Sequence, residues 1–208
     1  MRINRRTLAA CGAAALATGA AVAGSTQANA DDPKNVFAMH RSPGIVTAGC
    51  VPYAKAKVVV RNEGPVEVMK VHATGLPKRT DFDLFVIQVP NAPFGVGWYQ
   101  GDLETDRKGE ARGTFVGRFN QETFAVAPGT APAPSVHDGP FPDATSNPPF
   151  GPVHTFHLGL WFNSPTDAGK AGCPTNVTPF NGVHNAGVQV LNTAQFADTR
   201  GPLGRLKP

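Results

Sequence analysis

Short runs of hydrophobic residues, separated by glycine and proline, follow one another along most of the chain. In several of these runs hydrophobic and polar residues alternate, so that every second side chain lies on the same face, which is the period of a β-strand. The glycine- and proline-rich stretches between the runs are typical of turns, and together the two features indicate an all-β protein. The pattern predicts strands over 57–61, 66–74, 82–89, 97–105, 110–119, 122–126, 153–163 and 184–192.

Two of the predicted strands show how they would meet a core. Residues 82–89 are hydrophobic on both faces for most of their length, which is typical of a strand in the middle of a sheet that is covered on both sides. In 153–163, leucine and phenylalanine share one face, whereas His157, Gly159 and Trp161 share the other. We therefore expect 82–89 to lie in the middle of its sheet, and 153–163 is the clearest strand in the sequence.

Turn and capping residues complete the predicted fold. Residues 97–105 and 110–119 are expected to pair as a hairpin, because Gly109 between them can adopt the positive φ of a short connection. Residues 165–172 begin with proline and end with glycine, and Ser164 is a suitable N-cap, so at most one short helix is expected there. We predict a single antiparallel β-sandwich of the immunoglobulin-like type with long Pro/Gly-rich loops. A sheet barrel is the alternative, and the strand order does not follow from the pattern.

The first thirty residues differ in composition from the rest of the chain. Three arginines and no acid come first, an alanine-rich hydrophobic stretch follows over 8–24, and Ala28-Asn29-Ala30 ends the segment. These are the three parts of a cleaved secretory signal peptide, and the glycines within the hydrophobic stretch argue against a transmembrane anchor. Arg5-Arg6 also resembles a twin-arginine export signal, and the sequence does not decide between that route and ordinary secretion. We expect a secreted protein with signal peptide 1–30 and no membrane span after cleavage.

After cleavage, residues 31–208 are expected to form one domain. Residues 31–49 have little periodicity and are predicted to be an extended lead-in, 50–196 to be the sandwich, and 197–208 to be a loose C-terminal tail. Within the sandwich, residues 128–152 contain eight prolines and three glycines, so no strand or helix of normal length fits there. Long loops in compact domains are commonly functional, and this one is a candidate binding segment.

The charge of the chain changes when the signal peptide is removed. The whole chain has 19 Lys and Arg against 15 Asp and Glu, and the signal contains three of the arginines and no acid, which leaves 16 against 15. The remaining basic residues are scattered along the sequence and form no run. Nucleic-acid-binding proteins concentrate basic residues in one place, so we expect no nucleic-acid partner.

Cysteine and histidine supply the first candidates for chemistry. Cys11 belongs to the signal, which leaves Cys50 and Cys173, and two cysteines in a secreted chain are expected to form a disulfide. Neutral imidazoles could bind copper or zinc, although residues 154 and 157 point to opposite faces of a strand and would need a bulge to share a metal. No cofactor is expected on the main hypothesis, and the alternative is a metal site built from His137, His154, His157 and His184.

Acidic and nucleophilic residues indicate no reaction. Asp102, Glu104 and Asp106 alternate as in the start of a calcium loop, but Gly113 stands where the chelating glutamate should be, so a solvated acidic face is the simpler interpretation. The serines beyond residue 30 lie in no G-x-S-x-G motif, and no phosphate-binding glycine loop is found. The sequence leans towards a protein that is not an enzyme.

Aromatic residues are the remaining candidates for ligand binding. Rings on the face of a β-sandwich can stack on sugars or contact peptides, although large rings are more often part of a core. Trp98 and Tyr99 point to opposite faces of their strand, so at most one of them can join a given platform. The candidate binding residues are Trp98, Tyr99, Phe150 and Trp161.

Three stretches are similar to known sequences: TDFDLFVIQVPNAPFGVGWYQGDLETD (80–106), HLGLWFNSPTDAGKAGCP (157–174) and VTPFNGVHNAGVQVLNT (177–193). They resemble uncharacterised small secreted proteins of actinomycete-type bacteria. The resemblance implies a bacterial source and an extracellular or wall-associated location, and it implies no catalytic residues.

Three hypotheses of function remain. The first is a non-catalytic extracellular or cell-wall-associated binding module, with a wall glycan or an extracellular protein as its partner. The second is a secreted protein or oxidoreductase that depends on copper or zinc. The third is a structural component of a spore or wall coat. The absence of a catalytic set favours the first.

Overall fold

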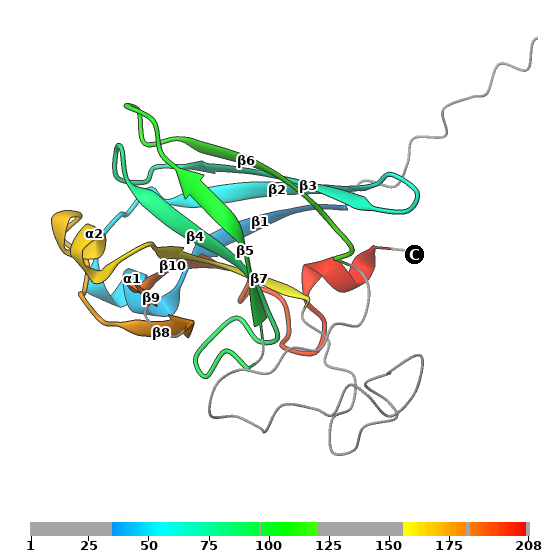
Figure 1. The fold of residues 1–208 in the computed structure, drawn as a ribbon. Coiled ribbons are helices and arrows are strands. Elements are labelled where there is room, and N and C mark those ends of the chain that lie inside the picture. The colour runs from blue at the N-terminus through cyan, green and yellow to red at the C-terminus, as the bar shows by residue number, and fades with distance from the viewer. Residues whose placement is uncertain (1–34, 96, 120–155, 182–183, 207–208) are drawn as a thin grey trace, which may run out of the picture. The chain divides into compact units, whose positions relative to one another are not determined.

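The computed structural model describes residues 35–95, 97–119, 156–181 and 184–206 (Figure 1). Two short α-helices, α1 (Pro43–Ala48) and α2 (Pro165–Lys170), and a 3₁₀ helix (Pro202–Arg205) accompany the strands. The strands are β1 (Asn35–Arg41), β2 (Lys55–Asn62), β3 (Glu67–Thr74), β4 (Asp81–Ile87), β5 (Gly97–Glu104), β6 (Ala111–Gly117), β7 (His157–Phe162), β8 (Thr178–Asn181), β9 (His184–Ala186) and β10 (Gln189–Asn192).

Eight of the strands form an antiparallel sheet in the order β5-β4-β7-β10-β1-β2-β3-β6, and β8 pairs with β9. Strand β1 connects two halves of the large sheet, because Asn35–Met39 pair with β2 whereas His40 and Arg41 pair with β10. The sheet therefore folds over at β1 into two layers (Figure 1). We call β1-β2-β3-β6 the first layer and β10-β7-β4-β5 the second layer.

The core lies between these layers. Alternate residues of β2 and β3 point into it, as the buried Ala56, Val58 and Val60 show. From the second layer, Phe82 and Phe162 meet with their ring centroids 5.0 Å apart. Burial of each side chain of this size contributes about 1.5–3 kcal/mol, so this interior is the main source of stability.

The outer strands of the two layers, β5 and β6, come close at the end of the core opposite β1. A Cβ on Gly113 would lie 2.6 Å from Leu103 Cδ2, and one on Gly101 would lie 2.7 Å from Phe115 Cε1. Gly101 also has a φ of 151°, which other residues rarely adopt. The missing side chains at these two positions allow β5 and β6 to approach.

The structure confirms an all-β, antiparallel fold of the sandwich type. It also confirms that β4 is central, since it pairs with β5 on one side and β7 on the other. The predicted hairpin is wrong: β5 pairs with β4 and β6 pairs with β3, and the turn over 106–109 connects the two layers instead. The predicted strand over 122–126 and the loop over 128–152 lie outside the described residues.

Both predicted ends of the domain need correction. The extended lead-in over 31–49 is wrong, since it contains β1 and α1, and α1 makes a second short helix where at most one was expected. Helix α1 begins with Ser42-Pro43, in the same way as α2 begins with Ser164-Pro165. Of these two N-cap serines, only Ser164 accepts a capping hydrogen bond with its side chain. The tail over 197–208 is not loose throughout, because its 3₁₀ helix buries Leu203, whose N–H donates to Phe156 O.

The disulfide between Cys50 and Cys173 is confirmed, with Cα atoms 5.4 Å apart. Each cysteine follows one of the two short α-helices, so the bond joins α1 of the first part of the chain to α2 near its end. It closes a loop with a sequence separation of 123 residues. No helix within the described part of the chain is long and apolar enough to cross a membrane.

Candidate functional site

The predicted aromatic residues divide between the two faces of the second layer. Tyr99 and Trp161 lie on its outer face, where both contact Phe85 at centroid distances of 5.7 and 5.2 Å. Trp161 is buried, whereas Tyr99 is 45% exposed. Trp98 points the other way, packs against the core, and donates from Nε1 to Gln100 Oε1 at 3.0 Å. Phe150 lies outside the described residues, so Tyr99 supplies the only exposed ring of the described candidates.

Carboxylates surround Tyr99 on this outer face. The phenol donates to Asp102 Oδ1 at 2.5 Å. Partial burial, this hydrogen bond, and the negative charges of Asp102 and Asp83 raise the pKa of Tyr99. The strand register places Asp83 opposite Asp102 and Asp81 opposite Glu104, so four acidic residues occupy two adjacent rows. The outer face of the second layer is therefore acidic around β4 and β5.

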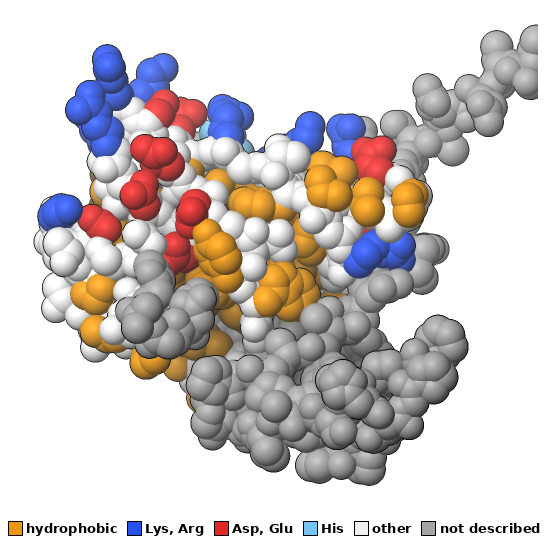
Figure 2. All heavy atoms as spheres, viewed as in Figure 1, with side chains coloured by type: hydrophobic (Ala, Val, Ile, Leu, Met, Phe, Trp, Pro, Cys, Tyr) orange, Lys and Arg blue, Asp and Glu red, His pale blue; other side chains and the backbone are white. Residues whose placement is uncertain are grey.

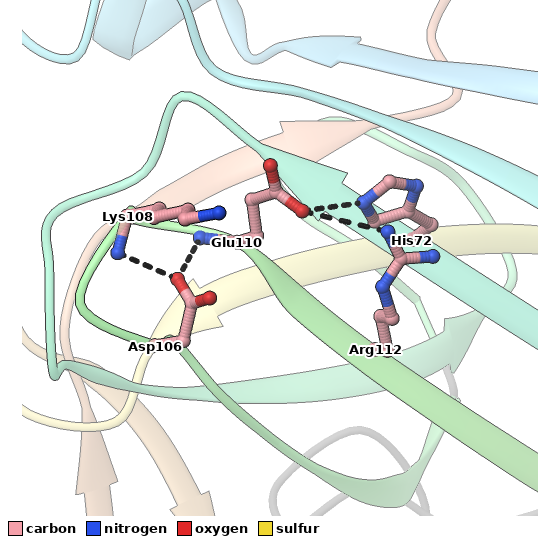
Figure 3. A network of polar contacts seen from close by, with 5 residues as sticks. All are labelled: His72, Asp106, Lys108, Glu110 and Arg112. Carbon is pink, nitrogen blue, oxygen red and sulfur yellow. Dashed lines mark hydrogen bonds and ion pairs between the residues drawn. The ribbon is translucent and has the colours of Figure 1, made fainter.

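Asp106, the third acid of the calcium-like pattern in the sequence, stabilises the turn that follows β5. Asp106 Oδ1 accepts hydrogen bonds from the backbone N–H of Lys108 at 2.7 Å and of Glu110 at 3.0 Å (Figure 3). These hydrogen bonds, the one from Glu110 first, lower the pKa of Asp106. The carboxylate of Asp106 thus caps a turn, and Asp102 and Glu104 point outward from the strand before it.

Of the predicted metal ligands, only the side chain of His157 is described. It is buried, with Nδ1 2.9 Å from Thr193 Oγ1 and Nε2 3.2 Å from both Ala197 O and Asp198 O. Burial is the main cause that lowers the pKa of His157. Both ring nitrogens are engaged in hydrogen bonds with the segment that follows β10, so neither is available to a metal.

The other three predicted ligands lie outside the described side chains. The side chain of His184 in β9, and all of His137 and His154, lie outside the described structure. Among the residues that the structure describes, no group of three or more His, Cys, Asp or Glu side chains could hold a metal ion.

The outer face of the first layer carries a group of basic side chains that the sequence analysis did not predict. Alternation turns one side chain in two outward, and none of these outward positions on β1, β2, β3 or β6 is acidic. Figure 2 shows Lys and Arg side chains along this edge of the molecule, with one acidic group beside them at the right, and most of the carboxylates lower, towards β5. We call this surface the basic face; its outward cations and histidines are His40, Lys55, Lys57, Arg61, Lys70, His72 and Arg112.

Two adjoining hollows open on the basic face, each of about 610 Å³. They share His40, Lys55 and Thr74 as lining residues, and so form a continuous groove across β1, β2 and β3. At one end the groove reaches Lys57 and His72. The other end is lined by Arg41 and Pro52, together with Tyr53, which is 81% exposed.

The cations of the basic face are neighbours across strands. The register places Lys57 opposite His72, and His72 opposite Arg112. One acid reaches this row from its edge: Glu110 Oε2 lies 3.3 Å from His72 Nε2 and 3.4 Å from Arg112 Nη2 (Figure 3). Lys55, Lys57 and His72 thus stand among the apolar residues that line this part of the groove. Glu110 offsets the positive charge on the β6 side.

The sequence did contain one indication of the basic face. Lys55 and Lys57 are two residues apart, as are Lys70 and His72, so each pair lies on one face of its strand. The pairing of their strands could not be derived, so their meeting on one face was not predicted. No protein-family model, curated protein or solved structure matches this chain.

Proposed function

We propose that this protein is a non-catalytic binding module that acts outside the cell and holds a polymeric ligand in the groove of the basic face. The observation that carries the proposal is the groove itself, an open hollow on the outside of a sheet whose other side is the core. Ligand sites are concave surfaces lined by a few polar groups, and the shared His40, Lys55 and Thr74 provide such groups.

The floor of the groove is suited to binding without rearrangement. It consists of β1, β2 and β3, which pair along most of their lengths and bury Phe37, Met39 and Val58 on the opposite side. Sites on strands are held more rigidly than sites on loops, and a preorganised site loses less entropy when it binds. The groove is open along its length, which suits an extended chain better than a small molecule that must be enclosed.

Two features support a location outside the cell. The first is the predicted export signal over 1–30. The second is the Cys50–Cys173 disulfide, since such bonds persist in oxidising compartments and are rare in the cytosol. A wall glycan or another extracellular polymer would be the ligand that such a module meets.

The test fills the groove without changing its charge. Ala38 points outward on β1 and lines the groove, so Ala38→Trp should block it. Val116→Trp is the matched control, because Val116 is 61% exposed on β6 of the same face and does not line either hollow. Binding of the oxidised protein to a panel of insoluble wall polysaccharides is measured by co-sedimentation, with thermal melts to check folding.

We expect Ala38→Trp to abolish retention and Val116→Trp to retain it. Equal binding by both variants would show that the ligand is held elsewhere, and the groove would lose its role.

A further inference from the structure

We propose that the ligand of this groove is an anionic polysaccharide, a glycan that carries a carboxylate or phosphate on its repeating unit. This inference rests on the proposed function and adds the chemical class of the ligand. Five lysine and arginine side chains point outward from strands of the basic face. Lys55 and Lys57 line the groove, whereas Arg61, Lys70 and Arg112 lie on the same face outside its lining.

The spacing of these cations suits a repeating polyanion. Neighbouring strands lie about 4.8 Å apart, and alternate residues along a strand about 6.7 Å apart. Lys57, His72 and Arg112 therefore form a row across three strands, while Lys55 and Lys57 follow one another along β2. A charged chain that crosses the face meets several cations at once, and many weak exposed contacts add up.

Residues 31–208 have nearly equal numbers of basic and acidic residues, 16 against 15, and the separation of these charges within the molecule explains how they could attract a polyanion. Acidic residues gather around β4 and β5 on the outer face of the second layer, whereas the outward strand positions of the basic face hold none. Like charges brought together repel one another, and a bound polyanion would relieve that repulsion. Glu110 reduces the repulsion between these cations at the edge of the face, beside His72 and Arg112.

The other side chains of the face favour a glycan over a nucleic acid. Besides its cations and histidines, the outward strand positions are valine, alanine and threonine, including Val59, Val68 and Thr74. Proteins that bind single-stranded nucleic acids stack successive bases on several aromatic rings. No Phe, Tyr or Trp lies at these strand positions, and Tyr53 is the one such exposed ring among the described residues that line the groove. Hydroxyl groups such as that of Thr74 can exchange hydrogen bonds with sugar hydroxyls. The groove is also shaped to receive a chain, whereas a bilayer presents a broad surface.

The experiment measures binding of the oxidised protein to polygalacturonate, with neutral dextran as the uncharged probe, over a range of salt concentrations. The variant Lys55→Gln/Lys57→Gln/Lys70→Gln removes three charges from the basic face. The matched control Arg107→Gln/Lys170→Gln/Arg200→Gln removes three charges from elsewhere. Thermal melts confirm that both variants fold.

We expect polygalacturonate to bind and dextran not to bind. The affinity should fall with salt, and the face variant should weaken it at least about tenfold and lower the salt slope by about one for each charge removed. The control variant should stay close to the parent.

The contrary results separate the two proposals. If dextran bound as tightly as polygalacturonate at high salt, and Ala38→Trp still blocked it, the proposal of an anionic ligand would be wrong. The proposal of a binding groove would stand. Failure of every glycan to bind through the groove would overturn both. Tighter binding of double-stranded DNA or of anionic lipid vesicles than of polygalacturonate, at the same salt concentration, would overturn the assignment to a glycan.

Discussion

Glu110 lies against His72, with Oε2 of the carboxylate 3.3 Å from Nε2 of the ring (Figure 3). The two residues come from neighbouring elements, since His72 is in β3 and Glu110 directly precedes β6. Asp106 fixes the position of Glu110 by accepting a hydrogen bond from its backbone N–H. A capped turn thus places Glu110, the one acid of the described residues that an ion pair joins to this row of cations. Removal of its charge should leave the row more positive.

Glu110→Gln should therefore tighten the binding of an anionic glycan. The substitution keeps the size of the side chain and removes one negative charge at a partly exposed site, so we expect about a two- to fivefold gain in affinity at low salt. Glu104→Gln is the control, because it removes the same charge from the outer face of the second layer. Titration calorimetry with polygalacturonate checks both, and an equal gain in the two variants would mean that net charge alone acts.

Strand alternation predicted the faces of single strands well. In β7 it placed Leu158 and Leu160 on one face and Trp161 on the other, and the structure puts the leucines in the main core while Trp161 packs against Phe85 outside it. The signal is strong there because both faces are buried and each needs large side chains. Predictions of this kind depend only on neighbouring residues, so one sequence is enough.

Strand β1 and the basic face show where the sequence was insufficient. Val36 is hydrophobic but points outward and is 50% exposed, so β1 shows no clear alternation of polar and hydrophobic residues. Lys57, His72 and Arg112 form a row only because β2 pairs with β3 and β3 with β6. Such pairings between distant segments depend on the packing of the whole fold, and no local pattern encodes them.

The free energy of unfolding should decrease as the pH falls below neutrality, and His157 should be one cause. Burial lowers the pKa of His157 in the folded protein below its ordinary value of 6.5. The folded state therefore binds this proton less readily than the unfolded state, so the contribution of His157 is fully present above about pH 6.5 and is lost as the pH falls towards the lowered pKa.

Urea unfolding at several pH values between about 5 and 8 measures this dependence. His157→Gln should be less stable at neutral pH, because it gives up contacts with Thr193 Oγ1 and with backbone carbonyls after β10. It should also show a shallower decrease on acidification. An unchanged pH dependence in the variant would assign the effect to other groups.

The disulfide should supply a large part of the stability. Cross-linking residues separated by 123 positions restricts the unfolded chain, and the chain-entropy model gives roughly 4–5 kcal/mol as an upper figure for a loop of this length. The double variant Cys50→Ala/Cys173→Ala should lose up to that amount in guanidinium unfolding. Reduction of the parent protein with dithiothreitol is the comparison, and a loss below about 1 kcal/mol in both would contradict the entropic argument.

The close approach of β5 and β6 should make Gly113 sensitive to substitution. A Cβ at this position would lie 2.6 Å from Leu103 Cδ2 and 2.8 Å from the ring of Phe115, which is closer than real Cβ contacts. Gly113→Ala must displace one of these side chains from a packed interior, and such overpacking costs typically 1–3 kcal/mol. We expect a decrease of about that size in the free energy of unfolding.

Gly44 provides the matched control for this substitution. It lies in α1 and has no atom within 4 Å of the added Cβ, so Gly44→Ala should leave stability unchanged or raise it by about 0.4–1 kcal/mol through the lower entropy of the unfolded chain. Urea unfolding of the two variants tests the pair. If Gly113→Ala were as stable as Gly44→Ala, the edges of the two layers would have to be further apart than the structure places them.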